Sequence, residues 1–380
     1  MFDRQQLFSG THPELSALLR EWQGGAPAMG LLAFLPEAEK ARVGDLQAAC
    51  QEAGIPLLGA IFPALISDAA FVTSGIWLLR VPQMPPHFLL EDMDAPPFDA
   101  GQRMGEAIKS ALRHSGDHEA QHVLFMIFDG MLPAIGSALI NLHTTFDRQL
   151  PCSGINAGSE TFQPMPCLFD NTRLLGNAVI GMILPENTRF AVEHGYPVAK
   201  TIMRATSTLG NRIDKIDGRP AMTVYQEVIK AEFGIELTHQ NFYDYAVHYP
   251  FGVVTALDVL VRIPVAFDED GSIFCVGEVP PNSVLRLLRA PTLAESNCVD
   301  RLAVDLKAPG HQTPGGQNIL TFYCAGRRMH FGEESAYELA NLQAATGAHQ
   351  LIGALTLGEI DSSHDLHIPR FHNASVVCLS

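Results

Sequence analysis

Positive charge is scarce in this sequence. Lys and Arg number 25 against 41 Asp and Glu, which gives the 380-residue chain a formal net charge of −16. Such a field repels the phosphates of nucleic acids and the headgroups of anionic lipids. The composition therefore argues against nucleic acid and against a membrane surface as partners.

Cysteine is also sparse, and its spacing suggests no bonded framework. The seven cysteines are scattered and never form a C-x-x-C pair, which argues against disulfides and against a zinc knuckle. Long apolar runs are missing as well, because the most apolar stretch, Leu57 to Ile66, is too short for a membrane span and contains Pro63. The first residues lack the apolar core of a signal peptide. We expect a cytoplasmic protein.

Catalytic motifs are a third absence. The sequence contains no Walker A motif, no G-x-G-x-x-G, no G-x-S-x-G, no H-E-x-x-H and no EF-hand loop. The Gly-rich turn Cys152 to Gly158 follows a predicted strand, but no Lys-Ser/Thr pair follows it, so a tight structural turn is favoured over a phosphate site. Nothing in the spacing predicts an enzyme.

Hydrophobic residues, by contrast, make up 47% of the chain and charged residues 17%, a composition typical of a large folded core. One pattern recurs three times: an apolar strand, a helix, a strand with an embedded glycine, and a closing strand. It predicts an α/β fold with mixed sheets built from repeated strand-helix-strand-strand units. The opening strands are Met29 to Leu35, His122 to Phe128 and Asn318 to Tyr323; the glycines are Gly59, Gly154 and Gly353; the closing strands are Gly75 to Val81, Asn177 to Leu184 and Ala374 to Leu379.

The sequence between the second and third units is rich in strand and turn signals. One amphipathic helix interrupts it, from about Ala221 to Phe233, with Gly234 suited to a left-handed C-cap. Apolar runs on either side of the Asp270-Gly271 turn predict a hairpin. We place a domain boundary near residue 215, which gives two domains, 1–215 and 216–380.

Several short motifs, in this order along the chain, resemble a known family. Cys152 to Gly158, Gly176 to Leu184, Val192 to Val198 and Ile216 to Ala221 resemble the N-terminal half of FIST-domain proteins. Thr321 to Arg328, Ile352 to Ile360 and His372 to Ser375 are similar to the C-terminal half. The two predicted domains would then be a FIST N-type and a FIST C-type domain. The first unit departs from the family pattern at Gly59 to Pro63, which puts ligand contacts there in doubt.

The resemblance implies a sensory protein that binds a small molecule or gas, and no catalytic activity. Some family members are haem proteins that sense nitric oxide and act on a partner histidine kinase in a two-component system. A haem-free sensor of an amino acid or metabolite is the alternative, and a small-molecule enzyme using His194 and Glu359 is a further one. Whether the chain forms a homo-oligomer is left open.

A haem b site would need a neutral imidazole beside large apolar groups. The segment Thr238 to Gly252 fits best, because it interleaves two histidines with aromatic residues. We therefore predict His248 as the iron ligand and His239 as the second choice, with Tyr249 or Tyr245 as oxygen-ligand alternatives. Phe251 would line the porphyrin, and Arg262 would pair with its propionates.

A second group of residues is predicted to line the ligand pocket that the family shares. His194 and Gly195 belong to the His-Gly-Tyr-Pro stretch of the resemblance, and Arg219 stands in an Asp-Gly-Arg-Pro turn. A guanidinium at residue 219 could hold a ligand carboxylate bidentately. An ordinary salt bridge is the simpler interpretation of each arginine taken alone.

Overall fold

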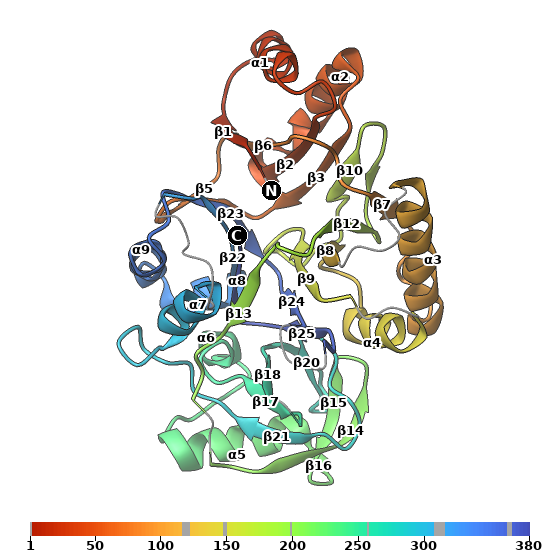
Figure 1. Cartoon of the computed structure of the whole chain (residues 1–380). Helices are drawn as coiled ribbons and strands as arrows, with labels where there is room; N and C mark the ends of the chain where they lie inside the picture. Colours follow the sequence, from red (N-terminus) through yellow and green to blue (C-terminus); the bar gives the residue numbers. More distant parts are fainter. Residues whose placement is uncertain are drawn as a thin grey trace.

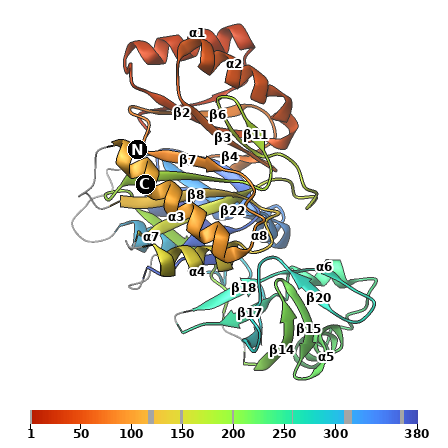
Figure 2. The ribbon, with the colours of Figure 1, turned by 90° about the vertical axis from the view of Figure 1, so that its right-hand side faces the viewer.

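The computed structural model describes residues 2–115, 122–146, 150–197, 200–256, 258–307, 316–362 and 367–380. Three similar units form a ring, and a separate β domain lies below them in the view of Figure 1. Figure 2 shows the same order from the side, with the first unit and the β domain at opposite ends. Mixed sheets and two structural bodies confirm the predicted α/β class.

Each unit supplies an edge strand, a helix, a parallel pair of strands joined by a helical connection, a hairpin and a closing strand. The first unit contains β1 (Arg4–Phe8), α1 (His12–Gly24), β2 (Gly30–Pro36), η1 (Glu37–Arg42), α2 (Val43–Ala53), β3 (Leu57–Phe62), β4 (Leu65–Ser67), β5 (Ala70–Val72) and β6 (Ile76–Val81). The second contains β7 (His87–Leu90), α3 (Pro97–Ser115), β8 (His122–Asp129), α4 (Ile135–Thr145), β9 (Cys152–Ala157), β10 (Leu168–Asp170), β11 (Leu174–Leu175) and β12 (Val179–Pro185).

The third unit is interrupted by the β domain, which is inserted between its edge strand and its first helix. The unit contains β13 (Phe190–Glu193), α7 (Cys298–Leu306), β22 (Ile319–Cys324), α8 (Ala325–Phe331), α9 (Glu334–Thr346), β23 (Leu351–Thr356), β24 (Glu359–Asp361), β25 (Arg370–His372) and β26 (Val376–Leu379). The β domain contains β14 (Met203–Leu209), β15 (Arg212–Ile216), β16 (Arg219–Pro220), α5 (Ala221–Phe233), α6 (Phe242–Ala246), β17 (Phe251–Val254), β18 (Val259–Arg262), β19 (Pro264–Phe267), β20 (Ile273–Cys275) and β21 (Val284–Leu287).

The structure thus divides the chain differently from the predicted limits 1–215 and 216–380. Residue 215 lies within β15 of the inserted domain, and residues 316–362 and 367–380 join the ring instead of the β domain. The predicted helix is confirmed as α5, and Gly234 caps it with φ of +69°. Strands β19 and β20 pair as the predicted hairpin.

The three glycines occupy equivalent places, as predicted. Gly59, Gly154 and Gly353 are each the third residue of the second parallel strand, and they pair with Ala33, Met126 and Thr321. The reason for glycine is clearest at residue 353, where an added Cβ would lie 1.8 Å from the carbonyl oxygen of Thr321. The three units are therefore true structural repeats.

The hairpin of each unit completes the sheet of another unit. Strand β4 pairs with β23 of the third unit, β10 pairs with β3 of the first, and β24 pairs with β9 of the second. The exchange runs once around the ring and yields three six-stranded sheets of the same order. Each unit is thereby held in the ring by main-chain hydrogen bonds.

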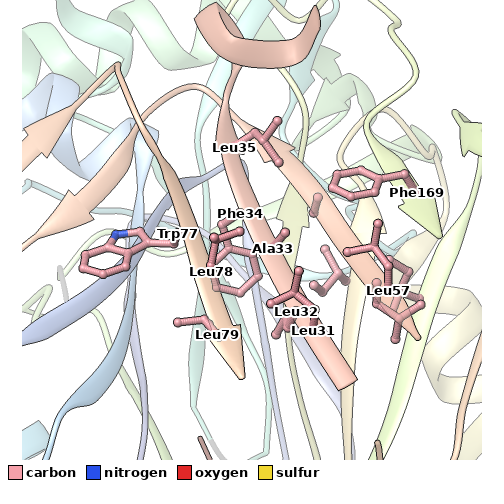
Figure 3. Packing of buried hydrophobic residues seen from close by; sticks show 14 of the residues in the cluster. Leu31, Leu32, Ala33, Phe34, Leu35, Leu57, Trp77, Leu78, Leu79 and Phe169 are labelled. Atoms are coloured by element: carbon pink, nitrogen blue, oxygen red, sulfur yellow. The ribbon is translucent and has the colours of Figure 1, made fainter. Parts of the chain in front are cut away.

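One face of each sheet contributes to a common apolar core. Phe322 of the third unit contacts Phe34 of the first and Phe125 of the second, with ring centroids 5.7 and 5.9 Å apart. Figure 3 shows the packing around β2, with Trp77 and Phe169 on either side of it. Helices cover the outer face of each sheet (Figure 1). Within the described ranges no helix is long and apolar enough to cross a membrane.

Candidate functional site

Buried polar side chains gather where the strands of the third unit end. Glu359, the first residue of β24, is fully buried, and its carboxyl group accepts hydrogen bonds of 2.6 Å from the hydroxyls of Thr356 and Ser375. His372 stands opposite Glu359 in the hairpin and is also buried. Burying such groups is costly, so their presence at one place calls for a reason.

The equivalent positions in the other two units show which side chains are sufficient for folding. The first residues of the equivalent hairpins are Leu65 in β4 and Leu168 in β10, and their partners across the hairpin are Val72 and Leu175. Two of the three repeats therefore fill the position with an apolar pair. The Glu359 and His372 pair is an addition of the third unit that the fold does not require.

Both groups of this pair are held uncharged near neutral pH. Burial raises the pKa of Glu359 to about 8, even though the neighbouring hydroxyls act in the opposite direction. Burial and the nearby Arg370 guanidinium lower the pKa of His372 well below its usual range. A carboxylic acid that stays protonated can donate a hydrogen bond as well as accept one.

A cavity of about 300 Å³ lies next to this polar group. Its wall is formed by the start of α8 at Cys324 and Gly326, by β19 of the inserted domain, and by the connection from β9 to β10. Asn373, which follows His372, also lines it. The cavity therefore lies where the third unit, the inserted domain and the second unit meet.

Cys324 separates the cavity from Glu359. Its sulfur accepts the backbone N–H of Ala374 at 3.2 Å, and it lies within hydrogen-bonding reach of the Glu359 carboxyl. Burial raises the pKa of this thiol to about 12, so it stays protonated.

The connection 158–167 is specific to the second unit. The equivalent connections span only residues 63–64 and 357–358. Phe162, at the mouth of the cavity, has φ of +53°, a left-handed conformation that bulky residues rarely adopt. Its backbone N–H is bonded to the Ser159 carbonyl, and the neighbouring Glu160 forms a 3.3 Å ion pair with Arg328 of α8. These contacts hold the Phe162 ring at the cavity.

The residues predicted for a haem do not share one cavity wall. His239 is exposed and stacks on Phe267, whereas Tyr249 packs on Phe233 with ring centroids 4.6 Å apart. Phe251 is buried in the core of the inserted domain, where its ring lies 4.9 Å from Tyr225. The structure thus gives Phe251 a packing role in the core of the inserted domain.

The two predicted arginines also have other partners. Arg262 is buried and donates to the carbonyls of Val261, Glu278 and Phe371, so its guanidinium ties the inserted domain to β25. Arg219 lies at the surface and forms an ion pair with Glu227. Neither arginine is directed at the cavity, in contrast to the predicted carboxylate contacts.

His248 has the most specific surroundings among the predicted ligands. It is half-buried, and its Nδ1 lies 2.7 Å from Nδ1 of His330 in α8. Nε2 of His330 lies 2.8 Å from the carbonyl oxygen of Pro291. Because a carbonyl oxygen only accepts hydrogen bonds, Nε2 of His330 carries the proton and donates it to Pro291. Burial lowers the pKa of both imidazoles. When both are neutral, His248 donates through Nδ1 and keeps a lone pair on Nε2.

His194 and Gly195 join the ring to the inserted domain. Nε2 of His194 lies 4.0 Å from Asp258, and the His194 carbonyl accepts a 2.6 Å hydrogen bond from Arg327. Gly195 has φ of +69°, and an added Cβ would lie 2.9 Å from the Ser296 hydroxyl. Among the described residues, the His194 ring approaches Asp258, whereas the Glu359 carboxyl group is hydrogen-bonded to Thr356 and Ser375. The structure therefore gives the predicted acid–base pair separate surroundings.

Asp258 also approaches Arg370, at 3.7 Å, and Arg370 lies 3.5 Å from Asp361. This guanidinium is buried and makes no hydrogen bond with any residue that the structure describes. The equivalent pair of the second unit, Asp170 and Arg173, is a close bridge of 2.6 Å. Arg370 is thus shared between its own hairpin and the inserted domain.

The residues that line the cavity are not among the predicted site residues, although the family-like motifs of the sequence contain several of them. Cys324 and Gly326 lie in the Thr321 to Arg328 motif, and Leu357 and Asn373 lie in the two motifs that follow it. These motifs are separate in the sequence and meet at the cavity. Family-like motifs that converge in space are a better guide to this site than aromatic density.

Comparison with family models gives two matches that cover most of the chain. Residues 29–219 match the FIST N domain, and residues 221–362 match the FIST C domain. The matches meet inside the inserted domain, at β16 and the start of α5. No curated protein matches the chain.

Proposed function

The chain belongs to the FIST family, whose domains are associated with small-ligand sensing in signal transduction, and we propose that its ligand binds in the cavity beside Cys324. One observation carries this proposal: the cavity is walled by the third unit, the inserted domain and the 158–167 connection together. A ligand that contacts all three stabilises one arrangement of them over others. FIST domains are sensory ligand-binding domains rather than catalytic ones.

Filling the cavity tests this site. We expect Val265→Trp to weaken binding of any small molecule that copurifies with the chain at least tenfold, because Val265 lines the cavity and is half-buried. Native mass spectrometry and calorimetry would measure the loss. Val304→Trp is the matched control, because Val304 is 69% exposed on α7 and does not line the cavity. Equal ligand occupancy in both variants would place the ligand elsewhere.

A haem-based sensor of nitric oxide is the second candidate, favoured by the hydrogen bonds that fix the tautomer of His248. The His330 imidazole fixes the proton of His248 on Nδ1. Nε2 of His248 therefore keeps the lone pair that an axial haem ligand needs. Val247, the preceding residue, lines the cavity. A haem bound at this point would supply an iron for nitric oxide. The remaining predicted haem contacts have other partners, so the proposal depends on this one histidine.

For this candidate we expect His248→Ala to lose the haem or to change its Soret band. Hydrophobic burial of the porphyrin, at about 25 cal/mol per Å² of apolar surface, favours partial retention with a changed spectrum. His239→Ala should leave the spectrum unchanged, because His239 is exposed. Absorption spectra before and after anaerobic nitric oxide would report both. A wild-type protein without a Soret band would exclude the haem candidate and leave the proposed ligand site in the cavity unaffected.

We further propose that the signal passes to a partner histidine kinase in the cytoplasm. The excess of acidic residues suits a protein partner better than nucleic acid or an anionic membrane. All seven cysteines are free and buried, which suits a reducing compartment. If the kinase contacts the ring or the inserted domain, a ligand that changes how these parts are arranged around the cavity would change the activity of the kinase.

A further inference from the structure

Among the residues that the structure describes, no free positive charge lines the cavity. Glu160 is the one charged residue in the described part of the wall, and its carboxylate is paired with Arg328 at 3.3 Å. The next arginine, Arg327, follows Gly326 in α8, but its guanidinium is directed away from the cavity to Glu338, at 2.6 and 2.7 Å. Arg262 is occupied by three carbonyls. Among the described residues, a carboxylate placed here would meet no cation that lacks a partner.

The described part of the wall also offers few side-chain hydrogen-bond donors. Most of it is aliphatic, with Val247, Ile263, Val265 and Leu357 among the lining residues. The amide nitrogen of Asn373 is already shared between the carbonyls of Val261 and Val276, at 3.2 and 3.0 Å. An ionised carboxylate buried against such a wall would lose its hydration without compensation.

The mouth of the cavity is equally apolar. Phe162, Tyr243 and Met329 surround it and are 37%, 60% and 60% exposed. Exposed apolar side chains that border a cavity are typical of a binding site for an apolar body. Behind the inner wall, Glu359 already occupies the hydroxyls of Thr356 and Ser375, so neither is free to stabilise an anion.

We propose that this cavity takes an uncharged, largely apolar small molecule and rejects carboxylates, free amino acids among them. The inference rests on the proposed sensory site and specifies its ligand class. An amino acid carries its carboxylate at every pH near neutrality, so it fails the same test as any organic acid. The apolar part of the ligand would lie between β19 and the Phe162 ring, with Cys324 and Asn373 at its inner end.

Acid and ester pairs test the proposal, because they keep the apolar body and change the charge. We would measure the dissociation constants of benzoate, phenylacetate and indole-3-propionate, and of their methyl esters, by isothermal titration calorimetry. At least one ester should bind, and it should bind at least tenfold more tightly than its acid, a ratio that corresponds to about 1.4 kcal/mol.

A cation placed at the mouth should change this preference. In Met329→Lys, an exposed position gains an ammonium group, and affinity for the acid should rise at least fivefold while affinity for the ester changes little. Val304→Lys adds the same charge on α7, away from the cavity, and should leave both affinities unchanged.

Two outcomes overturn different statements. Acids that bind wild type as tightly as their esters, with both lost in Val265→Trp, overturn the ligand class and leave the site in place. Esters that bind wild type and Val265→Trp equally, or that bind neither, overturn the site and this inference with it.

Discussion

Replacement of Arg327 by Met should lower the free energy of unfolding of the ring by about 3–5 kcal/mol, the usual cost of leaving one partner of a buried ion pair without the other. Arg327 is 0% exposed and Glu338 is 2% exposed. Two guanidinium nitrogens donate to the Glu338 carboxylate, and the Tyr323 hydroxyl donates to it as well, at 2.6 Å. Without the guanidinium, Glu338 would be a buried charge supported by one hydroxyl.

The effect also extends beyond the pair. Arg327 donates to the carbonyls of His194 and Ala374, which belong to the β13 end and to the loop before β26. Chemical unfolding followed by circular dichroism would measure the loss. The double variant Arg327→Met with Glu338→Leu should recover part of it, because it removes the unpaired charge along with its partner. A double variant as unstable as the sum of both single changes would contradict this account.

Glu359→Gln should remove a large part of the pH dependence of stability. The pKa of Glu359 is raised to about 8 from an ordinary value of 4.5, so between these values the folded chain holds a proton that the unfolded chain has lost. The stability that Glu359 contributes is therefore complete below about pH 4.5 and is lost as the pH rises toward 8, at more than about 1 kcal/mol per pH unit. The Gln variant keeps the shape and cannot ionise.

The measurement is the difference in unfolding free energy between wild type and Glu359→Gln across pH 4.5 to 9. Glu227→Gln is the matched control: Glu227 is exposed, and the Arg219 guanidinium beside it lowers its pKa, so its contribution to stability changes only at the acid end of this window. His372 contributes a separate dependence below its ordinary pKa of 6.5, which both chains share. A flat difference curve would show that Glu359 is ionised in the folded protein.

Local patterns carried most of the fold prediction. The opening strands, the glycines Gly59, Gly154 and Gly353, and helix α5 were all predicted, because hydrophobic period and turn residues act over a few neighbours. The exchange of hairpins was not. Residues Leu65–Ser67 form the same short apolar strand whichever sheet they join, so periodicity carries no information about the partner.

The site was predicted less well for a similar reason. Aromatic density drew attention to the segment that ends at Phe251, yet these rings mainly fill the core of the inserted domain. Glu359 was noted only as an acid that could work with His194. In the strand register of the three sheets, Glu359 stands at the position that Leu65 and Leu168 occupy in the other two units. Such a comparison needs coordinates, since the three hairpins share little sequence.

The cyclic exchange of hairpins gives the ring the geometry of a closed homotrimer written into a single chain. Three separate copies of one unit, each pairing its hairpin with the sheet of a neighbour, would form the same strand order. The side chains at each of the three hairpin–sheet junctions would then be identical. Covalent fusion removes that constraint of identity. One hairpin–sheet junction can then acquire Glu359 and His372 while the other two keep their apolar pairs. A symmetric framework can thus support a single asymmetric binding site.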